Sequence, residues 1–261
     1  MNGNVKSADG VSIAYRVEGS GNPTLVFVHA WCCNKTHWEP QISHFSAKYR
    51  VAAIDLGGHG ESGLERDRWT VAAFGEDVAA VVNHLTSDRV ILIGHCMGTG
   101  VILEAAQRIP GVVGIVGVEQ LADVNPKTYQ DLLDQLAALR SSPLEVVHDA
   151  LRKFASPWFL ETSDPTMVER INSDMCSTPR DVGIGAAEEF LRYDWGQALE
   201  KTTVPVRCIS ADHPFDLEAV RQYCPSFEVE FMSGVGHFVM LEDPVTFNRL
   251  LEGIVQKLVG Q

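Results

Sequence analysis

Three short apolar segments most strongly constrain how this chain can fold. They span residues 24–28, 51–54 and 90–93, and each ends at glycine, histidine or aspartate instead of continuing with helical spacing. Segments this short and this uniformly apolar are typical of strands that are buried on both faces of a parallel sheet. We therefore expect a parallel sheet at the centre of the fold.

Helical segments alternate with these strands. Residues 69–85 and 98–108 have apolar side chains at helical spacing, and the second segment stops at Ile109-Pro110. The remaining expected elements are strands at 112–118, 204–209 and 227–232, a closing helix at 244–258, and a leading β-hairpin at 6–17 around Asp9-Gly10. This alternation predicts an α/β fold with a doubly wound sheet.

One long segment breaks the alternation. Residues 125–203 contain only helical patterns, in the stretches 129–140, 144–154, 165–175 and 181–195. Such a segment is too long for a simple crossover between parallel strands. We therefore expect residues 1–122 and 204–261 to form the core domain, and residues 123–203 to form an inserted helical cap, or lid.

Composition and charge limit the classes of partner. The chain has 261 residues and a formal net charge of −13, which argues against nucleic acid or an anionic membrane as a partner. No apolar run approaches the roughly 18 residues of a membrane helix, and residues 1–19 lack the pattern of a secretory leader. We expect a cytoplasmic monomer or homodimer that acts on a small molecule.

The six cysteines are scattered along the chain. They stand at positions 32, 33, 96, 176, 208 and 224, without the spacing of a zinc site. Neighbours such as Cys32 and Cys33 rarely form a relaxed disulfide. We expect reduced thiols, no metal site and no cofactor.

Residues 94–98 read Gly-His-Cys-Met-Gly, between an expected strand and an expected helix. In this strand–turn–helix context, the Gly-x-nucleophile-x-Gly spacing holds the central side chain exposed on a strained turn. Glycines are needed where the two backbones nearly touch, and the N-terminus of the helix favours a thiolate. A nucleotide-binding turn would instead need G-x-G-x-x-G near the start of the chain. Cys96 is therefore the candidate nucleophile.

A nucleophile needs a base and donors for the oxyanion. His237 lies on the glycine-rich loop 233–238 after the last expected strand, where open α/β sheets place their sites. The backbone N–H groups of Met97 and Trp31 are the candidate oxyanion donors, with the Trp31 ring lining the pocket. For Trp38, a role in core packing and a role in lining the pocket are both open.

These residues, taken together and in this order, resemble the α/β-hydrolase superfamily. The motifs are His29-Ala30-Trp31, residues 55–62 (DLGGHGES), residues 94–98 and Gly236-His237-Phe238. The resemblance implies an eight-stranded, mostly parallel sheet, a helical cap after the sixth strand, and a nucleophile–acid–histidine triad. It also assigns Asp55 and Ser62 to a motif that fixes a loop. Cysteine replaces the usual serine, as in dienelactone hydrolases of this fold, and Ala30 replaces a glycine.

The acid of the triad has three candidates. In the superfamily the acid usually follows the second-last strand, which is expected here at residues 204–209. Pro214 occupies the position where that pattern has its aspartate, and Asp212 and Asp216 lie nearby in the sequence. Glu119 ends the apolar strand 112–118, where an unpartnered carboxylate would be costly to bury. Some haloalkane dehalogenases resemble this arrangement, with the acid after the sixth strand. We favour Glu119, and Asp212 and Asp216 stay open.

The expected activity is hydrolysis of small carboxylic esters, lactones or thioesters through an acyl-cysteine intermediate. Cys96, His237 and Glu119 would form the triad, with an ester and water as the substrates. Carbon–carbon bond hydrolysis and dienelactone-type hydrolysis could use the same triad. A ligand-binding protein without hydrolytic activity is a further alternative. Branches of the fold with an aspartate nucleophile are disfavoured, because they need a carboxylate at position 96.

Overall fold

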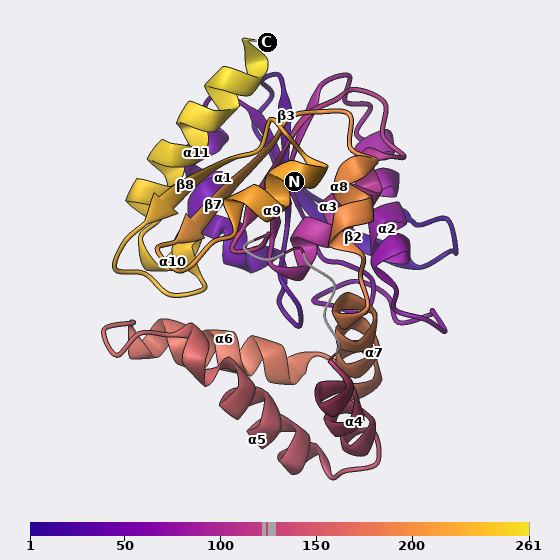
Figure 1. Ribbon diagram of the computed structural model, residues 1–261. Helices are drawn as coiled ribbons and strands as arrows, with labels where there is room; N and C mark the ends of the chain where they lie inside the picture. Colours follow the sequence, from indigo (N-terminus) through magenta and orange to yellow (C-terminus); the bar gives the residue numbers. More distant parts are fainter. Residues whose placement is uncertain (122–123, 125–128, 261) are drawn as a thin grey trace.

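An eight-stranded sheet forms the centre of the protein, in the strand order β1-β2-β4-β3-β5-β6-β7-β8 (Figure 1). The computed structural model describes residues 1–121, 124 and 129–260. The strands are β1 (Asn2–Lys6), β2 (Ser12–Glu18), β3 (Thr24–Val28), β4 (Arg50–Ile54), β5 (Val90–His95), β6 (Val112–Val118), β7 (Val206–Ala211) and β8 (Glu228–Met232). The β1–β2 and β2–β4 pairs are antiparallel, and all other neighbours are parallel. The predicted eight-stranded, mostly parallel sheet and its leading hairpin are confirmed.

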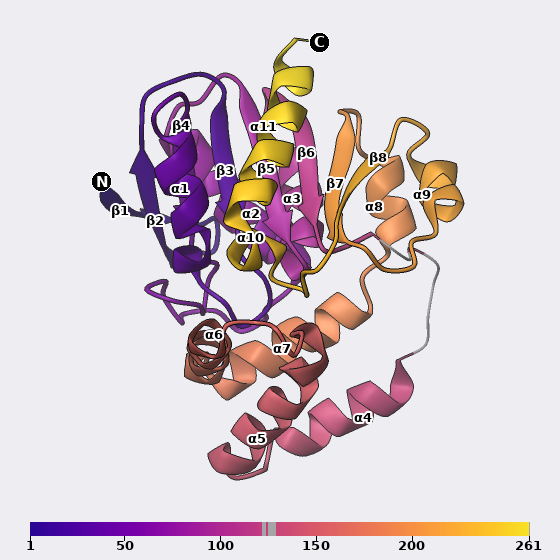
Figure 2. The same ribbon diagram turned by 90° about the vertical axis from the view of Figure 1, so that its left-hand side faces the viewer.

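Helices cover both faces of the sheet (Figures 1 and 2). Helices α1 (Glu39–Phe45) and α11 (Pro244–Val259) pack on one face, and α2 (Val71–His84), α3 (Met97–Ala106) and α8 (Trp195–Glu200) pack on the other. Every residue of β3 and β5 is buried as a result. This two-sided burial explains why their sequences are apolar apart from Thr24 and His95 at their ends, instead of alternating.

Four α-helices of the inserted segment lie together beyond the carboxyl ends of the parallel strands (Figures 1 and 2). They are α4 (Gln130–Leu139), α5 (Leu144–Ala155), α6 (Pro165–Ser177) and α7 (Arg180–Leu191), with the short η2 (Ser156–Trp158) after α5. We call residues 129–191 the helical insertion. Its expected start, at residues 123–125, lies outside the described residues.

Helix α8 differs from the other helices of this segment. It packs against α3 and against α9 (Leu217–Tyr223), so it belongs to the layer that covers the sheet. Its residues Ala198 and Leu199 are buried there. Among the described helices, those beyond the ends of the strands therefore end with α7 at Leu191, whereas the helical cap was expected to extend to residue 203.

The loop between β4 and α2 is fixed by Asp55 and Ser62. Asp55 accepts hydrogen bonds from the Lys35 N–H at 2.7 Å and from Lys35 Nζ at 2.6 Å. Ser62 Oγ donates to the Asp55 carbonyl at 2.6 Å and accepts from the Ala14 N–H at 2.8 Å. These contacts support the structural role that we expect for both residues.

Among the described residues, none of the helices combines the length and the apolar character that a membrane crossing needs.

Candidate active site

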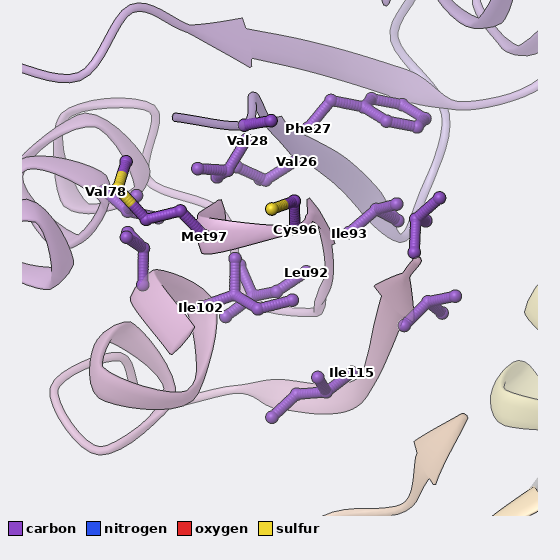
Figure 3. Packing of buried hydrophobic residues seen from close by; sticks show 14 of the residues in the cluster. Val26, Phe27, Val28, Val78, Leu92, Ile93, Cys96, Met97, Ile102 and Ile115 are labelled. Carbon is purple, nitrogen blue, oxygen red and sulfur yellow. The ribbon is translucent and has the colours of Figure 1, made fainter. Parts of the chain in front are cut away.

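Cys96 stands alone between β5 and α3, at φ 50° and ψ −116°. A positive φ is strained for a residue with a side chain, so the surrounding structure must hold it. The Cys96 N–H donates to the Val118 carbonyl of β6 at 2.8 Å, and its carbonyl accepts from the Thr99 N–H at 2.9 Å. Figure 3 shows Cys96 between Ile93 of β5 and Met97 of α3. The residue is 9% exposed.

The flanking glycines are required by the close approach of three backbones. A Cβ at Gly94 would lie 2.3 Å from the Gly98 carbonyl oxygen. A Cβ at Gly98 would lie 2.7 Å from the carbonyl oxygens of both Val28 and His29. The spacing seen in the sequence is therefore a consequence of packing β3, β5 and α3 together.

His237 lies on the loop between β8 and α10 (Val239–Glu242) and is held from two sides. Its N–H donates to the Trp158 carbonyl of the helical insertion at 2.8 Å. Its carbonyl lies 2.9 Å from Nε2 of His95 in β5. Burial holds the pKa of His95 well below its usual value, so this imidazole is neutral and donates through Nε2.

Glu119 directly follows β6 and has a positive φ of 54°. Its Oε2 lies 3.2 Å from Nδ1 of His237. Its Oε1 accepts a hydrogen bond from Ser210 Oγ at 2.9 Å and another from the Ala211 N–H. Burial raises the pKa of Glu119, but the hydrogen bond and charge of His237 and the two further donors outweigh it. The pKa is lowered, and the carboxylate stays ionised at neutral pH.

The other two acid candidates lie elsewhere. The Asp212 carboxylate is exposed and lies 3.4 Å from Ser233 Oγ. Asp216 caps α9 by accepting a hydrogen bond from the Ala219 N–H at 3.0 Å. Of the three carboxylates, the structure brings Glu119 to His237.

His213 contacts the same carboxylate and was missed by the sequence reasoning. Its Nε2 lies 3.6 Å from Oε1 of Glu119 and 3.2 Å from Ser210 Oγ. The signal available in the sequence was its position, one residue before Pro214 in the segment where the family pattern seeks an acid. Glu119 is thus flanked by an imidazole at each oxygen.

The charge state of His237 depends on its neighbours. Burial alone would lower its pKa, but its interactions with the Cys96 sulfur and with the Glu119 carboxylate raise the pKa of His237 to about 9. Its Nε2 is buried and has no conventional hydrogen-bond partner in the described part of the chain. The ring is therefore suited to hold a proton between the Glu119 carboxylate and the Cys96 sulfur.

The two candidate oxyanion donors are available. Met97 is the first residue of α3, so its N–H has no acceptor within the helix. Neither this N–H nor that of Trp31 donates to another described residue. The Trp31 indole donates through Nε1 to the Gly183 carbonyl at 2.7 Å, which fixes the ring against α7.

Trp31 and Trp38 have different surroundings. The Trp31 ring lines a cavity of about 150 Å³ that opens onto Cys96. The rest of the cavity wall comes mainly from α4, α5 and α7, with Trp158 of η2. Trp38 is fully buried, with its ring 4.9 Å from that of Phe27 and 6.2 Å from that of Phe247. Trp38 is therefore a core residue.

The described residues contain no group of three or more His, Cys, Asp or Glu side chains that could hold a metal ion.

A sequence profile described as alpha/beta hydrolase fold matches residues 23–244 of this chain. Among curated proteins, the chain is 24% identical over 260 residues to 3-oxoadipate enol-lactonase 2 of Acinetobacter baylyi, covering 96% of each. It is 28% identical over 240 residues to a bifunctional esterase/perhydrolase of Acinetobacter calcoaceticus, covering 82% of this chain and 84% of that one. Among solved structures, a thermophilic esterase from Thermogutta terrifontis matches with a TM-score of 0.85 and 20% identity over 99% of both chains. The strained turn at Cys96, the parallel sheet that carries it and the profile match together show that the chain belongs to the α/β-hydrolase fold family.

Proposed function

We propose that this protein hydrolyses small carboxylic esters, lactones or thioesters through a Cys96–His237–Glu119 triad. The observation that carries the proposal is the 3.2 Å contact between Glu119 and His237, whose ring also interacts with the Cys96 sulfur. The relatives named enol-lactonase and esterase support ester or lactone bonds as the target.

The first half of the reaction forms an acyl-enzyme. The Cys96 thiolate attacks the carbonyl carbon, and the N–H groups of Trp31 and Met97 stabilise the oxyanion. The tetrahedral intermediate then collapses, and the bond from the carbonyl carbon to the leaving group breaks. Nε2 of His237 gives its proton to the departing oxygen or sulfur. Glu119 keeps Nδ1 of the ring protonated and correctly oriented.

The second half restores the enzyme. Neutral His237 accepts a proton through Nε2 from a water molecule, whose oxygen attacks the acyl-cysteine carbonyl. The carbon–sulfur bond breaks, and the Cys96 thiolate leaves beside the imidazolium that has formed. The products are a carboxylic acid and the alcohol or thiol that left in the first half. In one turnover, His237 thus gives one proton to the leaving group and takes one from water, so Cys96 and His237 return to their starting states.

The helical insertion acts as the cap in this proposal. Its helices α4, α5 and α7 supply most of the wall of the cavity above Cys96. A substrate bound there would be shielded from water on the side opposite the sheet. The insertion would therefore determine which substrates reach the thiol.

Hydrolysis of p-nitrophenyl acetate and butyrate tests the proposal, with Cys96→Ala as the matched control. We expect the wild-type protein to hydrolyse both esters and the variant to show only background rates. Mass spectrometry of the quenched reaction should find the acyl group on Cys96. Wild-type rates equal to those of Cys96→Ala would refute the proposal and leave a ligand-binding protein as the alternative.

Selective labelling of the thiol provides a second test. Burial raises the pKa of Cys32, Cys33 and Cys208 and makes these thiols poor nucleophiles. Iodoacetamide should therefore alkylate Cys96 before these three, at a rate that depends on pH. Equal labelling of the four thiols in the folded protein would contradict an activated Cys96.

A further inference from the structure

The cavity above Cys96 has an almost wholly apolar wall. Its described lining residues include Leu136 of α4, Leu151 and Phe154 of α5, and Phe190 of α7. No described lining residue carries a charged side chain, and the polar groups among them are the Cys96 thiol, the Gln135 amide and the indole N–H groups of Trp31 and Trp158. A group that binds in this cavity therefore gains from apolar contact and meets no ionic partner among these residues.

The geometry of the proposed reaction indicates which part of the substrate lies in the cavity. In the tetrahedral intermediate the leaving group must face His237, which protonates it, and the oxyanion must face the N–H groups of Trp31 and Met97. The acyl group takes the remaining direction. Cys96 and Trp31 line the cavity, whereas His237 does not. The acyl group is thus the substituent that points into the cavity.

Size and wall chemistry together define the acyl groups that fit. The cavity volume is about 150 Å³, and an apolar cavity of about this volume in another protein holds benzene. A carboxylate placed among these side chains would lose its hydration without gaining a cationic partner among the described lining residues. We propose that this cavity is an acyl pocket for uncharged apolar acyl groups such as butanoyl, hexanoyl and benzoyl, and that it rejects acyl chains that end in a carboxylate. This inference rests on the proposed hydrolase function.

A series of p-nitrophenyl esters with a constant leaving group tests the pocket. The decisive pair is p-nitrophenyl hexanoate and mono-p-nitrophenyl adipate, which have acyl chains of the same length and differ by a terminal carboxylate. We expect kcat/KM to be about a hundredfold or more higher for the hexanoate. We also expect hexanoate and benzoate to exceed acetate, because acetate leaves the cavity largely unfilled.

Substitutions at Gln135 test the same point within the protein. Gln135 is exposed at the mouth of the cavity, so Gln135→Arg can place a cation there without burying it. We expect this variant to raise the adipate-to-hexanoate ratio of kcat/KM severalfold, which is the size of effect that a partly solvated ion pair gives. The matched control, Gln135→Met, has a similar length and no charge, and it should not raise the ratio.

A substitution that fills the cavity supplies an independent measurement. Leu136→Trp adds volume to the wall at α4, and the hexanoate-to-acetate ratio should fall about tenfold. Ratios are compared for each variant, so a partly destabilised protein still gives a valid reading.

The outcomes separate this inference from the proposed function. If no ester is cleaved faster than by Cys96→Ala, the hydrolase function itself is wrong. If acetate is cleaved but the adipate ester is as good a substrate as the hexanoate, only the acyl pocket is wrong. The pocket assignment is also overturned if kcat/KM increases with the size of the alcohol in a series of alkyl acetates but does not change with acyl length in the p-nitrophenyl series. The cavity would then hold the alcohol.

Discussion

Oε2 of Glu119 lies 3.2 Å from Nδ1 of His237, across 118 positions of the chain. The carboxylate reaches the ring from the end of β6, and β7 supplies Ser210 and Ala211 as donors to its other oxygen. The Glu119 carboxylate is thus positioned by two neighbouring strands at once.

The first prediction concerns the identity of the acid. Glu119→Gln should lower kcat/KM by about a hundredfold to ten-thousandfold, because an amide neither fixes the tautomer of His237 nor stabilises its charge. Asp212→Asn removes a carboxylate that makes no contact with His237 and should stay within about twofold of wild type. Hydrolysis of p-nitrophenyl butyrate measures both. A large loss in Asp212→Asn with Glu119→Gln unaffected would reverse the assignment.

The second prediction concerns the interaction of Cys96 with His237. In Cys96→Ser the neutral hydroxyl no longer supplies the charge that helps to raise the pKa of His237 to about 9. The pKa of His237 should therefore fall, which an NMR titration of the ring protons would detect. An unchanged pKa in Cys96→Ser would mean that Glu119 alone sets it.

The third prediction concerns the pH dependence of activity. The imidazolium of His237 is lost as the pH rises through about 9, so kcat/KM should decline on that side of the profile. Glu119→Gln removes one of the charges that hold the proton on the ring. Its alkaline decline should begin at lower pH, in whatever activity remains. A profile with the same alkaline limb in both proteins would show that His237 and Glu119 are not coupled.

The fourth prediction concerns how stability depends on pH. His237 has a raised pKa in the folded state, so its contribution is complete below the ordinary value of 6.5 and is lost as the pH rises through about 9. Glu119 has a lowered pKa, so its contribution is present above the ordinary value of 4.5 and is lost as the pH falls. Urea unfolding between neutral pH and pH 10 should show a loss of stability that His237→Gln reduces.

The fifth prediction compares two glycines. Gly98→Ala would place a Cβ 2.7 Å from two backbone oxygens of the β3 segment, and should destabilise the protein by about 1–3 kcal/mol. Gly253 lies inside α11, and a Cβ there would meet nothing within 4 Å. Gly253→Ala should stabilise by about 0.4–1 kcal/mol, because it restricts the unfolded chain. Thermal unfolding of the two variants gives the comparison.

The strands were predictable because each buried run has a simple local signature. β3 and β5 are apolar except for Thr24 and His95 at their ends, and these ends differ from the expected ones by no more than two residues. Helix α1 was not predicted, because only seven residues form it and so short a segment gives no clear helical periodicity. Its stability comes from Ile42 and Phe45 packing into the core, which is information that no short window of sequence contains.

The residues of the candidate site also fall into two groups, those that local sequence motifs indicate and those that depend on contacts in space. Cys96 and His237 could be proposed from local motifs, since the turn around each is encoded by adjacent glycines. The choice among Glu119, Asp212 and Asp216 depends on which carboxylate meets the ring in space, so it could only be ranked. The contact of His213 with Glu119 and the shape of the cavity depend on packing between distant segments, which short sequence patterns do not determine.

The hydrogen bond from the His237 N–H to the Trp158 carbonyl links the loop that carries His237 to the helical insertion. From the core side, the same residue is held by Nε2 of His95 and by the Glu119 carboxylate. The insertion therefore supplies both most of the cavity wall and, through η2, one of the contacts that fix the position of His237.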